Sequence, residues 1–355
     1  MITRRTLLAA AATSPLLASG ATKKKLPYLQ IGVGHPHANK IGVYRASEDW
    51  EVIGVVEEDE KLREAAKKKK EYQDLPFLSL DEGLQSPGLK VVGIETEVRD
   101  LLRYARVAVD AGFHVHLDKP AGTSFSEYRE LLQRADAKGL VVQMGYMYRF
   151  NPAIQLLHQI LDEGWLGQVF ETHAVMSKVM PSASRQVIDE FDGGTMFELG
   201  CHIIDLTVGV LGAPEKVQSH PRRTLVDADD TLVDNMLAVL EYPTATATVR
   251  STALEVEGFS RRHFTVCGTE GTCHIQPLDR PVMELSLSQA RSFPGGREFK
   301  KGRQTISFDP PYARYVGDAA DLAATVRGEQ ENRYPSAHDL AVQETVLRAS
   351  DMPVE

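Results

Sequence analysis

The sequence predicts an α/β protein of two domains, the first built on a parallel sheet and the second on a largely antiparallel sheet. Two observations predict this fold class. Short apolar strands alternate with helices of about ten residues in the first half, which is typical of a parallel sheet with right-handed crossovers. From about residue 168 to 304, strand-like segments separated by Gly and Pro turns dominate. A chain of 355 residues has room for two domains of ordinary size.

The individual elements follow from the same patterns. In the first half, apolar runs predict strands at residues 28–33, 50–56, 91–94, 114–117 and 141–144, with helices at 40–47, 62–72, 101–111 and 126–138. In the second half we expect strands at 169–175, 237–240, 245–251, 262–267 and 272–275. One helix should follow Gly193-Gly194, and two closing helices are expected at 312–327 and 337–349.

The composition excludes several classes of protein. Forty-nine acidic and 40 basic residues give a net charge of −9, so the basic excess typical of nucleic-acid binding is missing. Three cysteines match neither a disulfide framework nor a zinc pattern. After the N-terminus, no run approaches the roughly 18 apolar residues that a membrane-spanning helix needs, so we expect no stable membrane insertion.

The first 21 residues have the layout of an export signal. The pair Arg4-Arg5 precedes a weakly apolar run at 7–18, and Ser19 and Ala21 are the small residues that suit cleavage after Ala21. Paired arginines before such a run predict a twin-arginine signal. We therefore expect a periplasmic or otherwise exported protein, with the twin-arginine export machinery as a partner. An ordinary amphipathic N-terminus is the alternative.

A glycine turn follows the first strand. In Gly32-Val33-Gly34-His35-Pro36-His37, Gly32 suits a tight turn and Gly34 lets a pyrophosphate approach the backbone, while His37 stands where the dinucleotide fingerprint has a third glycine. Glu57 ends the second strand 23 residues after Gly34, close to the spacing of a carboxylate that accepts ribose hydroxyls. Such a carboxylate would repel a 2′-phosphate, which favours NAD over NADP. The alternative for Glu57 is a solvent-facing turn acid.

Lys119 follows the strand at 114–117 within Asp118-Lys119-Pro120. Ligand chemistry in parallel sheets gathers beyond the carboxyl ends of the strands, so Lys119 is expected at that rim. A lysine there could hydrogen-bond a substrate hydroxyl and stabilise the alkoxide that precedes hydride loss. An exposed loop lysine is the alternative.

The predicted helix after Gly193-Gly194 carries the third group of chemical residues. Helical spacing places Glu198, His202, Asp205 and Gly209 on one face. A carboxylate one turn before a histidine can orient its imidazole and stabilise the charge of a general base. A histidine with a structural role between the domains is the alternative.

These segments together resemble the Gfo/Idh/MocA oxidoreductases. The resemblance runs from about residue 29 to 349 and includes four motifs, at 118–120, 145–152, 198–205 and 266–272. It implies a Rossmann domain at 22–147 after the 1–21 signal, and an α/β domain with a large open sheet at 148–355. It also implies NAD(P)-dependent oxidation of a sugar or polyol hydroxyl, or the reverse reduction. His202 would be the general base, Lys119 its proton-relay or orienting partner, and Glu198 the supporting carboxylate.

The chain departs from the family pattern at the cofactor. Asp118 and Glu198 exchange Asp and Glu relative to the usual motifs, and the segment 95–99 replaces a Thr-Pro-Asn-like turn beside the nicotinamide, where Val98 cannot make an amide contact. The residues expected to bind cofactor are Gly32, Gly34, His35, His37, Glu57, Thr96 and Lys119. No metal ligands are expected, because the pairs His35/His37 and His114/His116 lack partner acids or cysteines at matching spacing.

Substrate contacts are expected where the domains join and just before the catalytic helix. The predicted set is Tyr148, Arg149, Asn151, His173, Arg185 and Asp205, with bracing of the domain boundary as the alternative for Arg149. We also expect a homo-oligomer, a dimer or tetramer formed through the second sheet.

Three functions stay open. The first is a dehydrogenase of a carbohydrate or polyol, and the second is a glycosidase or lyase of the same fold whose bound NAD is regenerated without net redox. The third is a non-catalytic binding or scaffold protein. The compartment beyond the membrane offers little free dinucleotide. An exported enzyme would have to keep its cofactor, so we expect NAD to be tightly bound.

Overall fold

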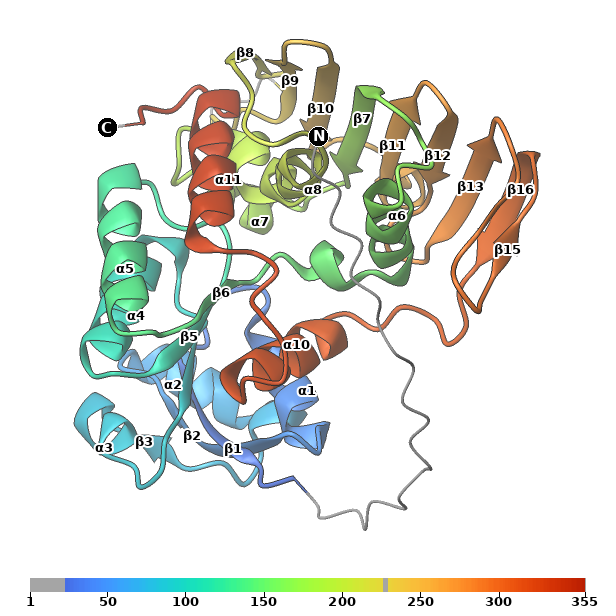
Figure 1. The fold of residues 1–355 in the computed structure, drawn as a ribbon. Helices are drawn as coiled ribbons and strands as arrows, with labels where there is room; N and C mark the ends of the chain where they lie inside the picture. Colours follow the sequence, from blue (N-terminus) through green and yellow to red (C-terminus); the bar gives the residue numbers. More distant parts are fainter. Residues whose placement is uncertain (1–22, 226–228, 355) are drawn as a thin grey trace, which may run out of the picture.

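The computed structural model describes residues 23–225 and 229–354. The predicted export signal at 1–21 lies outside the described residues. Figure 1 shows two sheets, each with its own helices, and a C-terminal segment that returns to the first sheet.

The first sheet is parallel throughout, which confirms the predicted fold class. Its strand order is β3-β2-β1-β4-β5-β6, so β1 and β4 lie at its centre. The strands are β1 (Leu26–Ile31), β2 (Trp50–Val56), β3 (Phe77–Leu78), β4 (Val91–Ile94), β5 (His114–Leu117) and β6 (Val142–Met144). Since all strands run the same way, the glycine turn after β1, Glu57 after β2 and Lys119 after β5 reach the same edge.

Helices connect these strands. They are α1 (Ile41–Ala46), α2 (Glu60–Lys67), α3 (Leu80–Leu84), α4 (Leu101–Asp110) and α5 (Phe125–Ala137). The short pair β3 and α3 was not predicted from the sequence. Ser79 caps α3, because its hydroxyl accepts from the backbone N–H of Glu82 while the Glu82 carboxylate accepts from the N–H of Ser79.

The second sheet is eight-stranded and mostly antiparallel, as expected. Its order is β16-β13-β12-β11-β7-β10-β9-β8, and β7 and β10 form its one parallel pair. The strands are β7 (Val169–Ser177), β8 (Lys216–Arg222), β9 (Asn235–Glu241), β10 (Thr246–Thr252), β11 (His263–Gly268), β12 (Gly271–Ile275), β13 (Val282–Leu287) and β16 (Gly302–Ser307), with a small hairpin of β14 (Arg291–Ser292) and β15 (Glu298–Phe299). The sequence did not predict β8, β13 and β16, whose alternating or polar residues form no continuous apolar run.

The helices of the second half are α6 (Pro152–Asp162), α7 (Ser182–Ile188), α8 (Cys201–Leu211), α9 (Gly258–Arg261), α10 (Val316–Val326) and α11 (Ser336–Ala349). The last two lie close to the predicted closing helices. Helix α6 was missed, although Asn151-Pro152 carries a helix-start signal. The Asn151 side chain accepts from the N–H of Ala153, and Pro152 occupies the first turn.

Helix α10 packs on the first sheet although it comes late in the chain. Ala319 and Leu322 are buried with Tyr28, Tyr44 and Trp50, and the indole N–H of Trp50 donates to the carbonyl of Ala319 at 3.0 Å. In Figure 1, α10 lies beside α1, and α11 lies between α5 and the second sheet. The C-terminal segment therefore joins the two domains, and both contribute to one large apolar core.

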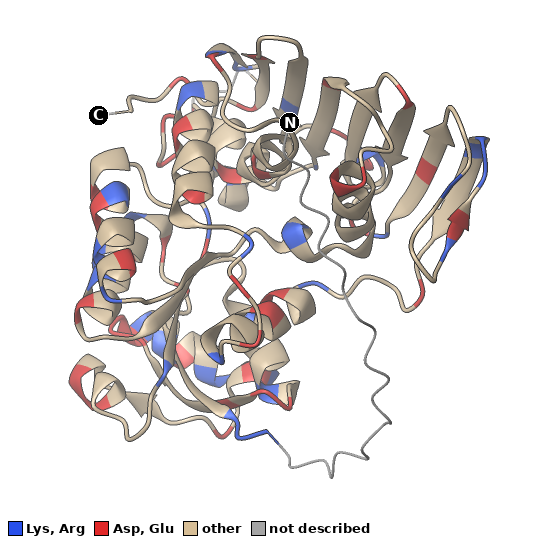
Figure 2. Ribbon diagram, in the orientation of Figure 1, with Lys and Arg blue, Asp and Glu red and all other residues tan. Residues whose placement is uncertain are grey.

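Figure 2 shows basic and acidic residues interspersed over the helices of the first domain. No helix among residues 23–225 and 229–354 is both long and apolar enough to cross a bilayer.

Candidate functional site between the two domains

The glycine turn after β1 is crowded at both of its glycines. Gly32 has a φ of +89°, and a Cβ on it would lie 2.5 Å from the backbone nitrogen of Thr96. A Cβ on Gly34 would lie 2.9 Å from Cγ of Glu97. The turn therefore presses against the segment after β4, and any side chain at Gly32 would be strained as well as crowded.

A groove runs beside this turn, and we call it the nucleotide groove. It is lined by Gly32, Gly34, Glu57, Thr96 and Arg99, among others. The Glu57 carboxylate accepts from the backbone N–H of Val33 and of Asp59, each at 2.9 Å, which fixes it at the end of β2. Burial raises the pKa of Glu57, although both backbone hydrogen bonds favour its ionised form. Glu57 therefore lies on the wall where the sequence predicted the ribose contact.

The nucleotide groove meets a cavity of about 350 Å³ between the domains, which we call the interdomain cavity. Gly34 and Glu97 line both spaces. The first domain contributes His35, His37 and Lys119 to the cavity wall, and the second contributes Glu198 and His202. The predicted catalytic residues thus line one space that continues into the groove beside the glycine turn.

Lys119 is buried and bonded to Glu198. Its ammonium donates to Oε1 of Glu198 at 2.6 Å and to the Glu198 carbonyl at 2.9 Å. Burial alone would lower the pKa of Lys119, but Glu198, with smaller contributions from Cys201 and Asp118, more than offsets burial, and the pKa is raised. Because an ammonium has three N–H donors, one donor is left for a ligand.

Glu198 does not pair with His202 in the way helical spacing predicted. Residues Met196–Gly200 form a π-helical turn, and regular α-helix begins only at Cys201. A π turn adds a residue and breaks the i, i+4 register. The predicted common face of Glu198 and His202 is therefore interrupted, and the carboxylate is bonded to Lys119 instead.

His202 is buried among aromatic rings. Its ring lies 5.6 Å from that of Tyr148, 5.9 Å from that of His37 and 6.0 Å from that of Tyr146, centre to centre. Its Nδ1 has no hydrogen-bond partner among the described residues. Burial, followed by the charge of Lys119, lowers the pKa of His202 well below its usual range. The imidazole is therefore uncharged near neutral pH, the state in which it can accept a proton.

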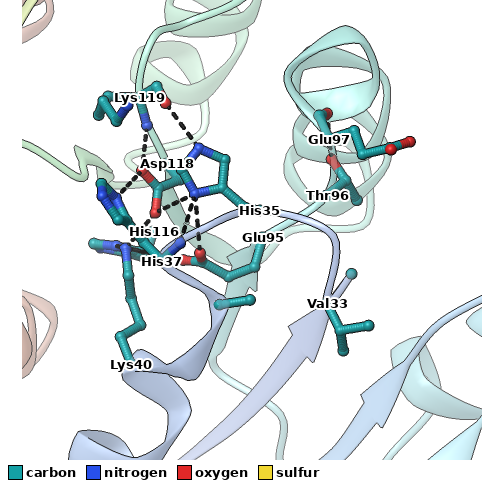
Figure 3. A network of polar contacts seen from close by, with 12 residues as sticks. Val33, His35, His37, Lys40, Glu95, Thr96, Glu97, His116, Asp118 and Lys119 are labelled. Atoms are coloured by element: carbon teal, nitrogen blue, oxygen red, sulfur yellow. Dashed lines mark hydrogen bonds and ion pairs between the residues drawn. The ribbon is translucent and has the colours of Figure 1, made fainter. Parts of the chain in front are cut away.

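A buried polar network lies behind Lys119 (Figure 3). The ammonium of Lys40 lies 2.6 Å from Oδ2 of Asp118, 3.0 Å from Oε1 of Glu95 and 2.9 Å from Nε2 of His116. Burial opposes the ionisation of Asp118, but the neighbouring His35, Lys40 and His37 hold its pKa well below the usual range. Burial and the charge of Asp118 raise the pKa of Glu95 well above its usual range. Lys40 thus favours the ionised form of both carboxylates, but its neighbours outweigh burial only at Asp118.

The same network holds the two histidines of the glycine turn. His37 Nδ1 lies 3.2 Å from Oδ1 of Asp118, and His35 Nε2 lies 3.1 Å from the carbonyl of Lys119. The sequence showed no acid near this histidine pair, but the fold brings Asp118 from the end of β5 to both rings. His35, His37 and Asp118 have the spacing of possible metal ligands. The ammonium of Lys40 already supplies a positive charge to Asp118.

Several residues predicted to contact substrate are held in polar networks away from the cavity wall. Arg149 is buried and pairs with Asp205 at 2.5 Å and with Asp339 at 2.6 Å. Arg185 pairs with Asp230 and, at 3.0 Å, with Asp234. Carboxylates of the chain pair with both guanidinium groups, although Nη1 of Arg185 is buried without a hydrogen-bond partner among the described residues. Arg149, Asp205 and Arg185 therefore brace the second domain in this structure.

The other three predicted contacts are placed differently from one another. His173 lies on the second sheet, where its Nδ1 is 2.5 Å from the Thr248 hydroxyl. Asn151 caps α6 and donates to the carbonyl of Leu278 at 2.7 Å. Tyr148 packs its ring against His202 and donates its hydroxyl to Asp279. Of the three, only Tyr148 touches a residue of the cavity wall that was predicted to be catalytic.

The cavity wall also contains residues that the sequence did not single out. They are three cations, Lys178, Arg262 and Arg314, and an apolar group that includes Met176, Met180 and Phe259. Isolated basic residues near strand ends carry no spacing signal, so only their convergence in space shows that they share one cavity.

Two family descriptions match this chain. The one described as "Oxidoreductase family, NAD-binding Rossmann fold" matches residues 27–146, and the one described as "GFO/IDH/MocA C-terminal domain" matches residues 154–274. Together they cover about two thirds of the chain. The chain belongs to the Gfo/Idh/MocA oxidoreductase family. The resemblance noted in the sequence is therefore confirmed at the level of the family.

Relatives of known name are similar over most of their length. Trans-1,2-dihydrobenzene-1,2-diol dehydrogenase of Bos taurus is 26% identical over 261 residues, covering 71% of this chain and 75% of the relative. D-xylose 1-dehydrogenase (NADP(+)) 2 of Haloferax volcanii is 29% identical, covering 68% and 71%. The structure of UDP-N-acetylglucosamine 3-dehydrogenase from Acidithiobacillus ferrooxidans superposes with a TM-score of 0.74 at 18% identity, covering 94% of this chain and 99% of that one. This last likeness concerns the fold.

The residues of this Gfo/Idh/MocA chain fit the dinucleotide that the family binds. Gly32 allows no Cβ, Gly34 allows one only if the Glu97 side chain shifts, and Glu57 is fixed beside this turn with its carboxylate on the groove wall. Thr96 lines the same groove, while His35 and His37 line the adjoining cavity. The adenosine part would lie along the nucleotide groove, and the nicotinamide would reach the interdomain cavity.

Proposed function

We propose that this protein is an NAD-dependent dehydrogenase that oxidises a CH–OH group of a carbohydrate, polyol or related diol, or reduces the matching ketone. The observation that supports it best is the convergence of Lys119, Glu198 and His202 on one cavity that is continuous with the glycine turn. The relatives named as diol and sugar dehydrogenases support the choice of a hydroxyl-bearing carbon.

Each side chain has a distinct part in this proposal. Bound NAD supplies the hydride acceptor or donor. His202, uncharged because of its burial, takes the proton from the substrate hydroxyl during oxidation and returns it during reduction. Lys119 donates its remaining N–H to the substrate oxygen and stabilises the developing negative charge. Glu198 holds the ammonium in place through two contacts.

The preference for NAD over NADP rests on the charge of the nucleotide groove. Glu57, Glu58 and Asp59 follow one another along its wall. A 2′-phosphate at the ribose would lie against these carboxylates and be repelled, whereas the ribose hydroxyls could donate to Glu57. Lys61 and Arg99 also line the groove, but Arg99 is already paired with Glu97 and Glu190.

Export by the twin-arginine route is part of the proposal and is supported by the residues Arg4 and Arg5 and the apolar run that follows them. An enzyme sent to a compartment poor in free dinucleotide must keep its cofactor. A retained cofactor must also be regenerated, either by a second substrate or by a redox-neutral glycosidase or lyase reaction. The redox-neutral reaction is the alternative function that export favours.

One screen separates these functions. The mature protein is incubated with sugars, sugar acids, polyols and aryl glycosides, and NADH absorbance and released aglycone are followed together. Net NADH, or substrate-dependent reduction of bound cofactor, supports the dehydrogenase. Aglycone release without net NADH supports the redox-neutral reaction. Binding of cofactor and sugar without turnover of any substrate would contradict both and leave a non-catalytic role.

A further inference from the structure

Four cations line the interdomain cavity, and three of them have partners within the chain. Lys119 is paired with Glu198. Arg262 and Arg314 share the carboxylate of Asp279, and the Arg262 guanidinium also lies 3.7 Å from the centre of the Phe259 ring. The fourth cation is Lys178, whose ammonium forms no hydrogen bond or ion pair with any described residue.

The carboxylates that line the cavity are also occupied. Glu97 and Glu190 both pair with Arg99, at 2.6 and 2.7 Å, and Glu198 pairs with Lys119. Within the described part of the chain, no carboxylate of the cavity wall is therefore left for Lys178. The Glu198 carboxylate still attracts Lys178 from a distance, but it is bonded to Lys119, so Lys178 has no ion pair while three other cations line the same wall.

The backbone that carries Lys178 is well anchored. Lys178 directly follows β7, and its N–H donates to the carbonyl of Thr252 at 3.1 Å. Val179 forms a bridge with Leu254, and the N–H of Met180 donates to the carbonyl of Ala253 at 3.0 Å. The ammonium is therefore presented from a fixed strand end.

The surroundings of Lys178 disfavour an isolated charge. The side chain is half-buried, and its neighbours in the chain, Met176 and Met180, are buried residues of the same wall. Burial, followed by the charges of Arg262 and Lys119, lowers the pKa of Lys178. A ligand anion at this position would relieve that cost and form a charge-assisted hydrogen bond.

We propose that Lys178 forms a subsite for a carboxylate of the substrate, so that hydroxyl-bearing acids such as sugar acids bind in preference to neutral sugars. This inference rests on the proposed function and specifies its substrate class. A carboxylate fits better than a phosphate, because the other cations of the wall are already paired and a single ammonium matches a single negative charge. The apolar residues Met176, Met180 and Phe259 would cover the carbon skeleton of the same substrate.

The test measures binding to the NAD-loaded protein by calorimetry, without turnover. The probes are matched pairs: D-glucuronate with D-glucose, D-galacturonate with D-galactose, and D-gluconate with D-glucitol, together with D-glucose 6-phosphate. For the wild type we expect tighter binding of at least one acid than of its neutral partner, weakened by added salt. Lys178→Met should reduce the affinity for that acid about 10- to 100-fold, and leave binding of the neutral partner and of NAD unchanged.

Lys90→Met is the matched control, because Lys90 is exposed at the opposite end of the first sheet, just before β4. It should bind every probe as the wild type does, and circular dichroism should show that both variants are folded. The proposal is overturned if no acid binds in a Lys178-dependent way, if Lys178→Met weakens acid and neutral partner equally, or if the sugar phosphate binds more tightly than every acid.

Failure of this inference and failure of the proposed function give different results. Lys178-dependent acid binding without any redox turnover would support the subsite and contradict the dehydrogenase. Turnover of a sugar acid and of its neutral partner that Lys178→Met leaves equally unchanged would support the dehydrogenase and contradict the subsite.

Discussion

The ammonium of Lys119 and the carboxylate of Glu198 lie 2.6 Å apart and join the two domains at the cavity wall. Lys119 follows the last-but-one strand of the first sheet, and Glu198 lies in the π-helical turn before α8. Removing one partner of such a buried pair leaves an uncompensated charge, so the contact fixes the relative position of the domains as well as the chemistry between them.

Replacing His202 should remove the general base. We expect His202→Ala to lower kcat about 10²- to 10⁴-fold, the usual effect of losing a positioned base. Cofactor affinity should scarcely change, because His202 is not among the residues of the nucleotide groove, where the adenosine part would be held. His220→Ala, an exposed histidine on β8, is the control. Wild-type turnover by His202→Ala would exclude His202 from the mechanism.

Replacing the Glu198 carboxylate should change the pH dependence of the reaction. Glu198 raises the pKa of Lys119 against the effect of burial, so Glu198→Gln should lower that pKa. The alkaline limb of the kcat/KM profile, where Lys119 loses its proton, should then move to lower pH. Glu198→Asp keeps the charge and should restore the limb toward its original position. An identical profile for wild type and Glu198→Gln would show that this ion pair does not control the reaction.

The cofactor preference can be tested at Glu57. We expect NAD to bind more tightly than NADP, and Glu57→Ala to weaken NAD binding about tenfold because hydrogen bonds to an ionised group are lost. The same change should narrow the difference between NAD and NADP. Dissociation constants from fluorescence titration measure both effects. Glu51→Ala, at the other end of β2, is the control, and tighter binding of NADP by the wild type would contradict the assignment.

Cofactor retention follows from the proposed export. The mature protein, purified without added dinucleotide and then denatured, should release nearly one NAD(H) per chain. A dissociation constant near 1 nM, which corresponds to about −12 kcal/mol, would suffice for such retention. A protein that is purified empty and needs external NAD for each turnover would count against tight binding and against export with cofactor.

The buried histidines predict a loss of stability in mild acid. Burial, together with the charge of Lys40, lowers the pKa of His116 to about 3. Below the ordinary histidine pKa, the unfolded chain binds a proton that the folded chain excludes, so stability falls as pH decreases from about 6.5 toward 3. His116 alone should contribute a loss of about 1.4 kcal/mol per pH unit in that interval.

Urea unfolding from about pH 7 to about pH 5 measures this slope. In His116→Gln the free energy of unfolding should fall less steeply with decreasing pH than in the wild type. The same substitution at the exposed His220 should leave the slope unchanged. Equal slopes for wild type and His116→Gln would show that folding does not lower the pKa of His116.

Local features of the chain were enough for the fold class and for the cofactor turn. Alternation of strands and helices, a glycine turn at the end of β1 and an acid at the end of β2 are each defined by residues close in sequence. For this reason Gly32, Gly34 and Glu57 are found together on the groove where they were expected. Elements without a continuous apolar run, such as β8 and β16, left no comparable signal.

Pairing of polar side chains was decided only by the tertiary structure. The sequence placed Glu198 one helical turn before His202. In the structure a π turn interrupts that register, and the Glu198 carboxylate pairs with Lys119, which is 79 residues away in the chain. Arg149 was expected to contact the substrate, but its buried guanidinium forms ion pairs with Asp205 and Asp339. Sequence patterns show which residue types are present and which face they occupy. A buried charge must be paired, and its partner can come from anywhere in the chain. Whether a charged group contacts a ligand or a carboxylate of the chain therefore depends on which segments the fold brings close to it.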